Sequence, residues 1–437
     1  MSVLQNRGSN LLKHARLFNN VSVARLMSGK AKTSAEVILR EKKVSAFNYD
    51  PLSVVISRGE GIYMWDVEGK KYFDFLGGFA TLNQGHCHPK ILKAMTDQLA
   101  TLHHTSRAIH HDCLYELNEF LTKTFGYDKV LNMNTGVEGG ETSIKIARKW
   151  GYRVKKIPEN QAQVVFAHGN FWGRTIAAIS ASTDPNSFNE FGPHVPGYQI
   201  VPYDDLGKLE QLLRNPNVCA FMVEPVQGEA GAVVPSPGYL KGVRELCDKY
   251  NVLWIDDEVQ AGLGRTGKLL AVDYDGVRPD VLILGKALSG GVYPISAVLA
   301  NDDIMGVLTP GTHGSTYGGN PLACKIALAA LDVILNDGLI DNAFKMGELF
   351  RSELTARLDK KKLVQVRGRG LLNAVVLDPK YSADSSVVSL AIKENGLVTK
   401  PIGTNMLRFS PPLTITESEL RQGIDIIVNT INGLSSE

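Results

Sequence analysis

Two short apolar stretches in the middle of the chain end in residues that could do chemistry. The first leads into Asp256-Asp257-Glu258, and the second, further along the chain, leads into Gly285-Lys286. In open α/β sheets, ligands bind at the carboxyl ends of the strands, and neighbouring parallel strands bring those ends to one edge. We therefore expect Asp257 and Lys286 to lie close together, either as an ordinary ion pair or as a pair that acts on a ligand.

An aspartate and a lysine at one sheet edge are the two groups that pyridoxal phosphate requires. The lysine amine binds the cofactor aldehyde covalently, and the carboxylate pairs with the protonated pyridine nitrogen, which keeps the ring an electron sink. Lys286 and Asp257 are therefore candidate catalytic residues. Either motif alone is equally compatible with a strand-end ion pair.

A glycine-rich turn indicates a phosphate site. The run Asn134-Thr135-Gly136-Val137-Glu138 opens a segment that we expect to be helical to about Trp150. Glycines next to a helix N-terminus expose backbone N–H groups to a phosphate. The run from His313 to Pro321, with Ser315 and Thr316, adds hydroxyl groups suited to the same anion. Combined with the aspartate–lysine pair, this turn makes pyridoxal phosphate the expected cofactor.

Longer motifs carry a resemblance to a known family. They are Gly169-Asn170-Phe171-Trp172-Gly173-Arg174-Thr175, Glu224-Pro225-Val226-Gln227-Gly228-Glu229-Ala230-Gly231, Asp257-Glu258-Val259-Gln260 and Gly285-Lys286-Ala287-Leu288. These runs resemble the class III aminotransferases of fold type I. From about Ala46 onward the chain is similar to the ornithine aminotransferase family, through Asn48-Tyr49-Asp50-Pro51-Leu52, Asn83-Gln84-Gly85-His86-Cys87-His88-Pro89 and Arg408-Phe409-Ser410-Pro411-Pro412.

The resemblance implies roles around the cofactor ring. Lys286 would be the Schiff-base lysine and proton shuttle, and Asp257 would pair with the pyridine nitrogen. Phe171 would stack on the ring, and Gln260 would contact its hydroxyl side.

The resemblance also implies a phosphate site shared between subunits. Gly136 and Val137 would donate backbone N–H groups, and the run with Ser315 would bring Thr316 in from the other subunit. A homodimer or a higher homo-oligomer is therefore expected, which is the common form of symmetric assembly.

Five residues are implied to bind substrate. Tyr49 and Arg174 resemble the residues that hold the far end of ornithine, Arg408 resembles the carboxylate-binding arginine, and Glu229 resembles its gate. Planar guanidinium groups suit bidentate capture of carboxylates. Phe79 is a departure, because family members often carry a tyrosine there. The absent hydroxyl puts a strict preference for ornithine in doubt.

The expected reaction is transfer of the δ-amino group of L-ornithine to 2-oxoglutarate, giving glutamate-5-semialdehyde and glutamate by a ping-pong mechanism. One alternative is another class III aminotransferase that acts on acetylornithine or 4-aminobutyrate. A second is a non-catalytic scaffold or cofactor-binding protein that has kept the fold.

The expected fold is α/β, with a large central domain built on a mostly parallel sheet and a small α+β domain built from both chain ends. Buried strands are expected at 164–167, 220–223, 252–255 and 281–284, with a helix at 239–250. We expect the small domain to comprise 36–88 and 339–437, and the large cofactor-binding domain to comprise 89–338.

Composition narrows the class of protein. Net charge is +2, and no cluster of basic residues is interleaved with aromatics, so nucleic-acid binding has little support. No apolar run reaches the ~20 residues needed to span a bilayer. The five cysteines are scattered, which argues against a disulfide framework. His86 and His88 have no third ligand at a suitable spacing, so no metal site is expected.

The first 35 residues have the composition of a mitochondrial transit peptide. They are basic, and the first acidic residue of the chain is Glu36. Leu11, Leu12, Ala15 and Phe18 fall at helical spacing. Such segments direct import and are removed, so we expect the mature protein in the mitochondrial matrix. The alternative is a disordered basic tail.

Overall fold

The computed structural model of the chain describes residues 33–434. The chain divides into two compact units, one made of residues up to Arg58 with Trp65–Lys71, the other of Gly59–Met64 with Tyr72–Glu437. The predicted import signal lies outside the described residues except for 33–35. The predicted domain limits at residues 88 and 338 stay predictions.

The first unit contains helix α3 (Ser34–Glu41). Thr33 caps it, because its hydroxyl accepts the N–H of Glu36 at 3.2 Å while the Glu36 carboxylate accepts the N–H of Thr33. The hydroxyl of Ser34 donates to Glu68 at 2.7 Å. Helix α3 therefore includes Ser34 and Ala35, the last two residues of the predicted import signal.

The chain forms a β-hairpin around the turn near residue 69. After β1 (Ile56–Glu60), the strands β2 (Tyr63–Asp66) and β3 (Lys71–Asp74) are neighbours in one sheet. The N–H of Asp66 donates to the carbonyl of Lys70 across the turn at 3.0 Å.

The second unit is built on a seven-stranded sheet. Its strands, in spatial order, are β4 (Lys129–Met133), β10 (Ser296–Ala300), β9 (Val281–Leu284), β8 (Leu253–Asp257), β7 (Val218–Val223), β5 (Gln163–Ala167) and β6 (Tyr198–Val201). β10 runs antiparallel to both of its neighbours, and the pairs from β9 to β6 are parallel. The four strands expected from the apolar runs are all present, so the mostly parallel sheet is confirmed.

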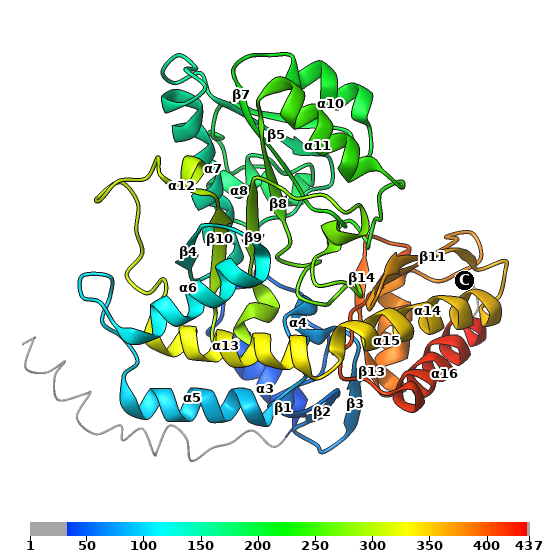
Figure 1. Cartoon of the computed structure of the whole chain (residues 1–437). Helices are drawn as coiled ribbons and strands as arrows, with labels where there is room; N and C mark the ends of the chain where they lie inside the picture. The colour runs from blue at the N-terminus through cyan, green and yellow to red at the C-terminus, as the bar shows by residue number, and fades with distance from the viewer. Residues whose placement is uncertain (1–32, 435–437) are drawn as a thin grey trace, which may run out of the picture. The chain divides into compact units, whose positions relative to one another are not determined.

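Helices cover both faces of this sheet, because successive side chains of a strand point to opposite sides. On β8, Trp254 packs in one core cluster, whereas Leu253 and Ile255 pack in another. The Trp254 face is covered by α6 (Asp112–Phe125), α10 (Leu206–Leu213), α11 (Tyr239–Tyr250) and α13 (Pro321–Asn336). The opposite face is covered by α7 (Gly136–Arg153), α8 (Ile176–Ile179) and α12 (Asp302–Met305). Helix α5 (Pro89–Thr101) runs alongside α13 (Figure 1).

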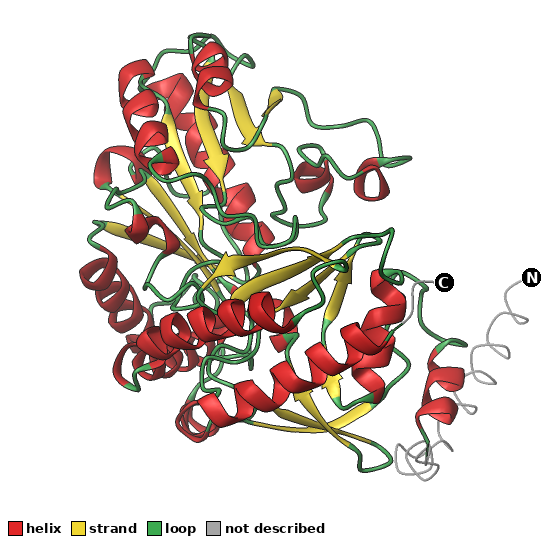
Figure 2. Ribbon diagram, turned by 90° about the vertical axis from the view of Figure 1, so that its right-hand side faces the viewer, coloured by secondary structure: helices red, strands yellow, loops and turns green. Residues whose placement is uncertain are grey.

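A smaller antiparallel sheet follows along the chain. Its order is β11 (Leu363–Arg369), β12 (Leu372–Leu377), β15 (Met406–Phe409) and β14 (Lys400–Ile402). Figure 2 shows helices packed along these strands. Helices α14 (Leu339–Arg357) and α15 (Ser385–Glu394) contact the strands, and α16 (Glu417–Gly433) packs against both of these helices.

Both chain ends contribute to one core here. Strand β13 (Leu397–Val398) pairs in parallel with β3. The ring of Phe350 lies between those of Phe75 and Phe409, with centroids 6.4 and 5.4 Å apart. The predicted fold class, an α/β domain with a small α+β part from both chain ends, is confirmed.

The remaining short elements are α4 (Gly77–Ala80), α9 (Pro185–Phe188), η1 (Ala271–Tyr274) and η2 (Lys286–Ser289). Across residues 33–434, no helix combines the length and apolar character that crossing a membrane would need.

Candidate active site

Asp257 and Lys286 meet at one edge of the large sheet, as predicted. Asp257 is the last residue of β8 and lies opposite Ile283 of the neighbouring strand β9. Gly285 separates that strand from Lys286, which opens η2. The Asp257 side chain is buried, and its Oδ1 accepts the N–H of Val259 at 3.1 Å.

The two groups change each other's ionisation. Burial raises the pKa of Asp257 to about 6, and the positive charge of Lys286 opposes that rise. Burial also lowers the pKa of Lys286, which increases the fraction of neutral, nucleophilic amine. Lys286 has φ +41°, a region that non-glycine residues seldom occupy and that clusters at functional sites.

The N-terminus of α7 lies close to the same edge. Thr135 caps the helix, and its hydroxyl accepts the N–H of Glu138. A Cβ on Gly136 would come within 2.9 Å of Val259, so only glycine permits this approach. The N–H groups of Gly136 and Val137 belong to the first turn, where they have no intrahelical partner and can bind an anion.

The loop with the two predicted hydroxyl residues is attached to this helix end. Asn134 Nδ2 donates to the Oγ of Ser315 at 2.9 Å, and that oxygen also accepts the N–H of Gly318 at 3.0 Å. Thr316, the next residue, is exposed.

Phe171 and Glu224 lie beside Asp257. The three residues line one small cavity, and the N–H of Phe171 donates to Glu224 Oε1 at 3.0 Å. Burial, reinforced by the charge of Asp257, raises the pKa of Glu224 to about 8. Our sequence reasoning gave Glu224 no role, although it carries the same signal as Asp257: it directly follows a buried strand, β7.

The residues expected to hold the far end of the substrate lie in different units. Arg174 is exposed, with its guanidinium carbon 5.8 Å from the centroid of the Phe171 ring and Nη1 donating to Ser187 at 3.3 Å. Tyr49 belongs to the first unit, where it is 63% exposed.

The predicted arginine and its gate form an ion pair. Arg408 is 1% exposed, and its Nη1 donates to Glu229 Oε1 at 2.5 Å and to Gln260 Oε1 at 3.1 Å. Its Nε and Nη2 are buried and have no partner among the described residues. Since buried donors are normally satisfied, two free N–H directions on one guanidinium suit an incoming carboxylate.

A second cation, which our sequence reasoning missed, holds the same carboxylate. Lys400 Nζ lies 2.9 Å from Glu229 Oε2 and 4.5 Å from the centroid of the Phe79 ring. Burial alone would raise the pKa of Glu229, but Arg408 and Lys400 outweigh it and lower the value to about 2. No spacing rule indicates Lys400, since its position depends on the pairing of β14 with β15.

These groups fit pyridoxal phosphate. An amine of lowered pKa faces a buried carboxylate, and a helix N-terminus with free N–H groups lies beside them. Residues 44–431 match the family described as aminotransferase class-III. The chain therefore belongs to the class III aminotransferases, enzymes that use pyridoxal phosphate.

Within that class, several similar proteins are ornithine aminotransferases. The enzyme of Drosophila ananassae, named "Ornithine aminotransferase, mitochondrial", is 61% identical over 398 residues, which cover 91% of this chain and 91% of the relative. A solved ornithine aminotransferase from Toxoplasma gondii, described with partial occupancy of PLP at its active site, has a TM-score of 0.92 and 48% identity, and the match covers 94% of this chain and 96% of that one. An acetylornithine aminotransferase from Elizabethkingia anophelis has a TM-score of 0.84 and 48% identity, covering 92% and 100%.

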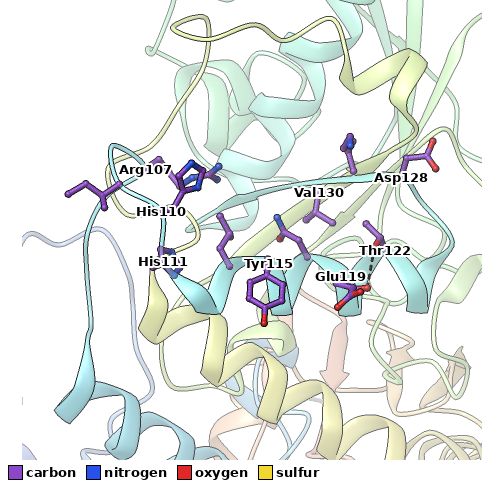
Figure 3. Close-up of a pocket in the computed structure, with 12 residues that line it drawn as sticks. Arg107, His110, His111, Tyr115, Glu119, Thr122, Asp128 and Val130 are labelled. Carbon is purple, nitrogen blue, oxygen red and sulfur yellow. Dashed lines mark hydrogen bonds between the residues drawn. The ribbon is translucent and has the colours of Figure 1, made fainter.

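A separate pocket of about 510 Å³ lies between α6 and β4. Figure 3 shows Arg107, His110 and His111 gathered at one end and Asp128 at the other. None of the predicted site residues lines it.

Proposed function

We propose that the protein transfers the δ-amino group of L-ornithine to 2-oxoglutarate, forming glutamate-5-semialdehyde and glutamate. The observation that carries the proposal is the buried Arg408, which is masked by Glu229 and still has two unpartnered donors. An arginine that can be covered and uncovered suits a site that must accept two different substrates in turn. This reaction would belong to arginine metabolism and proline biosynthesis.

The residues at the sheet edge have separate roles in this proposal. The Lys286 amine holds pyridoxal phosphate covalently and moves protons at the reacting carbon. The cofactor supplies the electron sink, and Asp257 maintains it by keeping the pyridine nitrogen protonated. With the cofactor bound, Phe171 would pack on its ring, Gln260 would contact its hydroxyl side, and Gly136 and Val137 would donate backbone N–H groups to its phosphate.

The two substrates place opposite demands on Arg408. Ornithine reacts through its distal amine, so only a methylene lies next to the reacting carbon, whereas glutamate places its α-carboxylate there. An uncovered arginine would favour glutamate and oppose ornithine by leaving a charge unpaired. Glu229 covers Arg408 for ornithine and moves away for the keto acid, while Tyr49 and Arg174 hold the far end of ornithine.

The gate can be tested by Glu229→Ala. Breaking a desolvated ion pair costs about 2–5 kcal/mol, enough to change substrate preference tens-fold. With Arg408 uncovered, single-turnover bleaching of the bound cofactor's visible band should become faster with glutamate and slower with ornithine. If both amino donors slow by the same factor, Glu229 only supports the site.

The reaction itself is tested by one spectrum. The holoenzyme should show a visible cofactor band that ornithine bleaches and 2-oxoglutarate restores. A band that persists with every amine would favour the non-catalytic alternative. Bleaching by acetylornithine or 4-aminobutyrate in preference to ornithine would favour another class III activity, which is kept open by Phe79 and by the likeness to an acetylornithine aminotransferase.

A homodimer would complete the phosphate site through Thr316 of a second subunit. In support, large apolar side chains are exposed near that loop and the pocket of Figure 3, among them Ile109, Tyr115 and Tyr317 at 66, 63 and 52%. Exposed apolar patches mark interfaces. Sedimentation at micromolar concentration should give twice the chain mass or a higher multiple.

The mitochondrial matrix is the proposed location, with residues 1 to about 35 as the import signal. The support is their basic composition and the word mitochondrial in the names of relatives such as that of Drosophila ananassae. A fluorescent protein fused after residue 35 should enter mitochondria, and diffuse fluorescence would contradict the assignment.

A further inference from the structure

The Glu229 carboxylate lies between two cations and gives one oxygen to each. Oε1 accepts from Arg408 at 2.5 Å, and Oε2 accepts from Lys400 at 2.9 Å. Arg408 is buried, whereas the Lys400 side chain is 30% exposed. The carboxylate therefore connects an inner, desolvated cation with an outer cation that is closer to solvent.

Strand pairing places the two cations side by side. Lys400 of β14 lies directly opposite Arg408 of β15 in the antiparallel register. Directly opposed residues project their side chains from the same face of a sheet and are close neighbours. Two like charges at such positions repel each other, and a carboxylate between them relieves the repulsion. The pair therefore forms a binding site for Glu229.

Phe79 holds the outer cation in place. The Lys400 ammonium lies 4.5 Å from the centroid of the Phe79 ring, and the Arg408 guanidinium carbon lies 5.6 Å from it. Cations are attracted to an aromatic face at these distances. Phe79 has φ +59°, as part of the kinked α4, so its place beside the two cations is set by an unusual backbone turn.

The gate requires a place for Glu229 when the keto acid occupies Arg408. A buried carboxylate that loses its only ionic partner pays the full desolvation cost. Glu229 does not face this cost, because Oε2 already contacts Lys400 and a rotation of the side chain would keep that contact.

We propose that Lys400 is a positioning residue that retains Glu229 in the open state of the gate and so determines how readily the site accepts a dicarboxylate. The proposal rests on the gate described under the proposed function. It assigns to Lys400 the keto-acid half of the reaction, because ornithine reacts with the gate closed.

The test is Lys400→Met, which removes the charge and keeps most of the stem. The KM for 2-oxoglutarate should rise about tenfold or more, since opening of the gate would leave the Glu229 carboxylate without a cationic partner. The single-turnover rate with ornithine should change much less than this KM, because Arg408 still holds Glu229 when the gate is closed. Lys400→Arg should restore the KM, because a guanidinium can hold the same carboxylate.

Lys380→Met is the matched control. It makes the same chemical change at an exposed lysine and should leave both half-reactions unaltered. The proposal would be overturned if Lys400→Met changed both half-reactions equally or changed neither. It would also be overturned if Lys400→Arg failed to restore the KM for 2-oxoglutarate.

A binding measurement separates this proposal from the proposed function. Glutarate is a dicarboxylate without an amine or keto group, so calorimetric titration of the holoenzyme reports on Arg408 without turnover. Lys400→Met should weaken glutarate binding about tenfold relative to wild type and to Lys380→Met. If ornithine is not a substrate, the proposed function is wrong. The effect of Lys400→Met on glutarate binding would still decide the role of Lys400. Unchanged glutarate affinity would overturn that role.

Discussion

At the scale of single residues, the site contains two carboxyl groups whose pKa values are raised by burial to different extents. Burial raises the pKa of Asp257 to about 6, and that of Glu224, which also feels the Asp257 charge, to about 8. Near pH 7, therefore, Asp257 is mostly ionised and Glu224 mostly protonated. An ionised Asp257 beside a neutral Glu224 suits the pairing with a protonated pyridine nitrogen.

Glu224→Gln should make the cofactor-free protein less sensitive to pH. A carboxyl group with a raised pKa keeps its proton in the folded state while the unfolded chain releases it, so stability falls as pH rises from about 4.5 to about 8. The neutral amide removes this contribution. The fall in Tm between pH 5 and pH 8 should be smaller in the variant than in wild type, and an identical fall would show that Glu224 does not titrate there.

Phe79→Tyr should sharpen the preference for ornithine. A site that offers a polar partner to a substrate polar atom discriminates strongly, whereas an apolar ring cannot. The ratio of kcat/KM for ornithine to that for 4-aminobutyrate should rise by about tenfold, the value of one hydrogen bond. An unchanged ratio would mean that another residue, such as Tyr49, already provides the discrimination.

Whether the sequence predicts one of these residues depends on whether a local sequence pattern or a tertiary contact determines its position. Asp257 and Lys286 could be found because each lies at the carboxyl end of an apolar run, and Glu224 was missed although it does the same. Arg408 and Glu229 were identified only through the family resemblance. Lys400 could not be found, because its role comes from the register between β14 and β15, and no local pattern encodes that register.

At the scale of elements, the apolar periodicity predicts the regular structure well. The helix expected at 239–250 is observed as α11 with the same limits, and the strand expected at 281–284 is β9. The kinked α4 was not anticipated, since Phe79 and Ala80 both have positive φ, a backbone region that non-glycine residues seldom adopt. Tertiary contacts must impose it, because local propensity does not favour it.

The capping of α3 alters the expected start of the ordered chain. A protein beginning at Glu36 lacks the Thr33 cap and the contact of Ser34 with Glu68. Loss of a cap costs about 1 kcal/mol, so this helix should fray. A protein beginning at Lys32 keeps both. Proteolysis near residue 40 should be faster for the shorter form, and equal rates would show that the cap contributes nothing.

At the scale of the whole molecule, the phosphate site raises the question of how many chains make one active site. Thr316 is exposed, and it follows Ser315, which is anchored to the N-terminal end of α7. An exposed hydroxyl on an anchored loop is well placed to act on a second copy. In such an assembly each active site would combine Lys286 of one chain with Thr316 of the other.

Mixing two damaged variants tests this arrangement. Lys286→Ala should abolish turnover, and Thr316→Ala should weaken cofactor binding by about 1.5–3 kcal/mol, the value of a hydrogen bond to a charged group. In a mixed dimer, the chain with Lys286→Ala still supplies an intact Thr316 to its partner, whose Lys286 is also intact. One site of that dimer is then fully native. Unfolding and refolding an equimolar mixture at limiting cofactor should therefore give more activity than the two variants refolded separately, approaching a quarter of the wild-type value when subunits pair at random. If Thr316 acts within its own chain, every active site carries one of the two substitutions. The activity of the mixture will then equal the average of the two separately refolded samples.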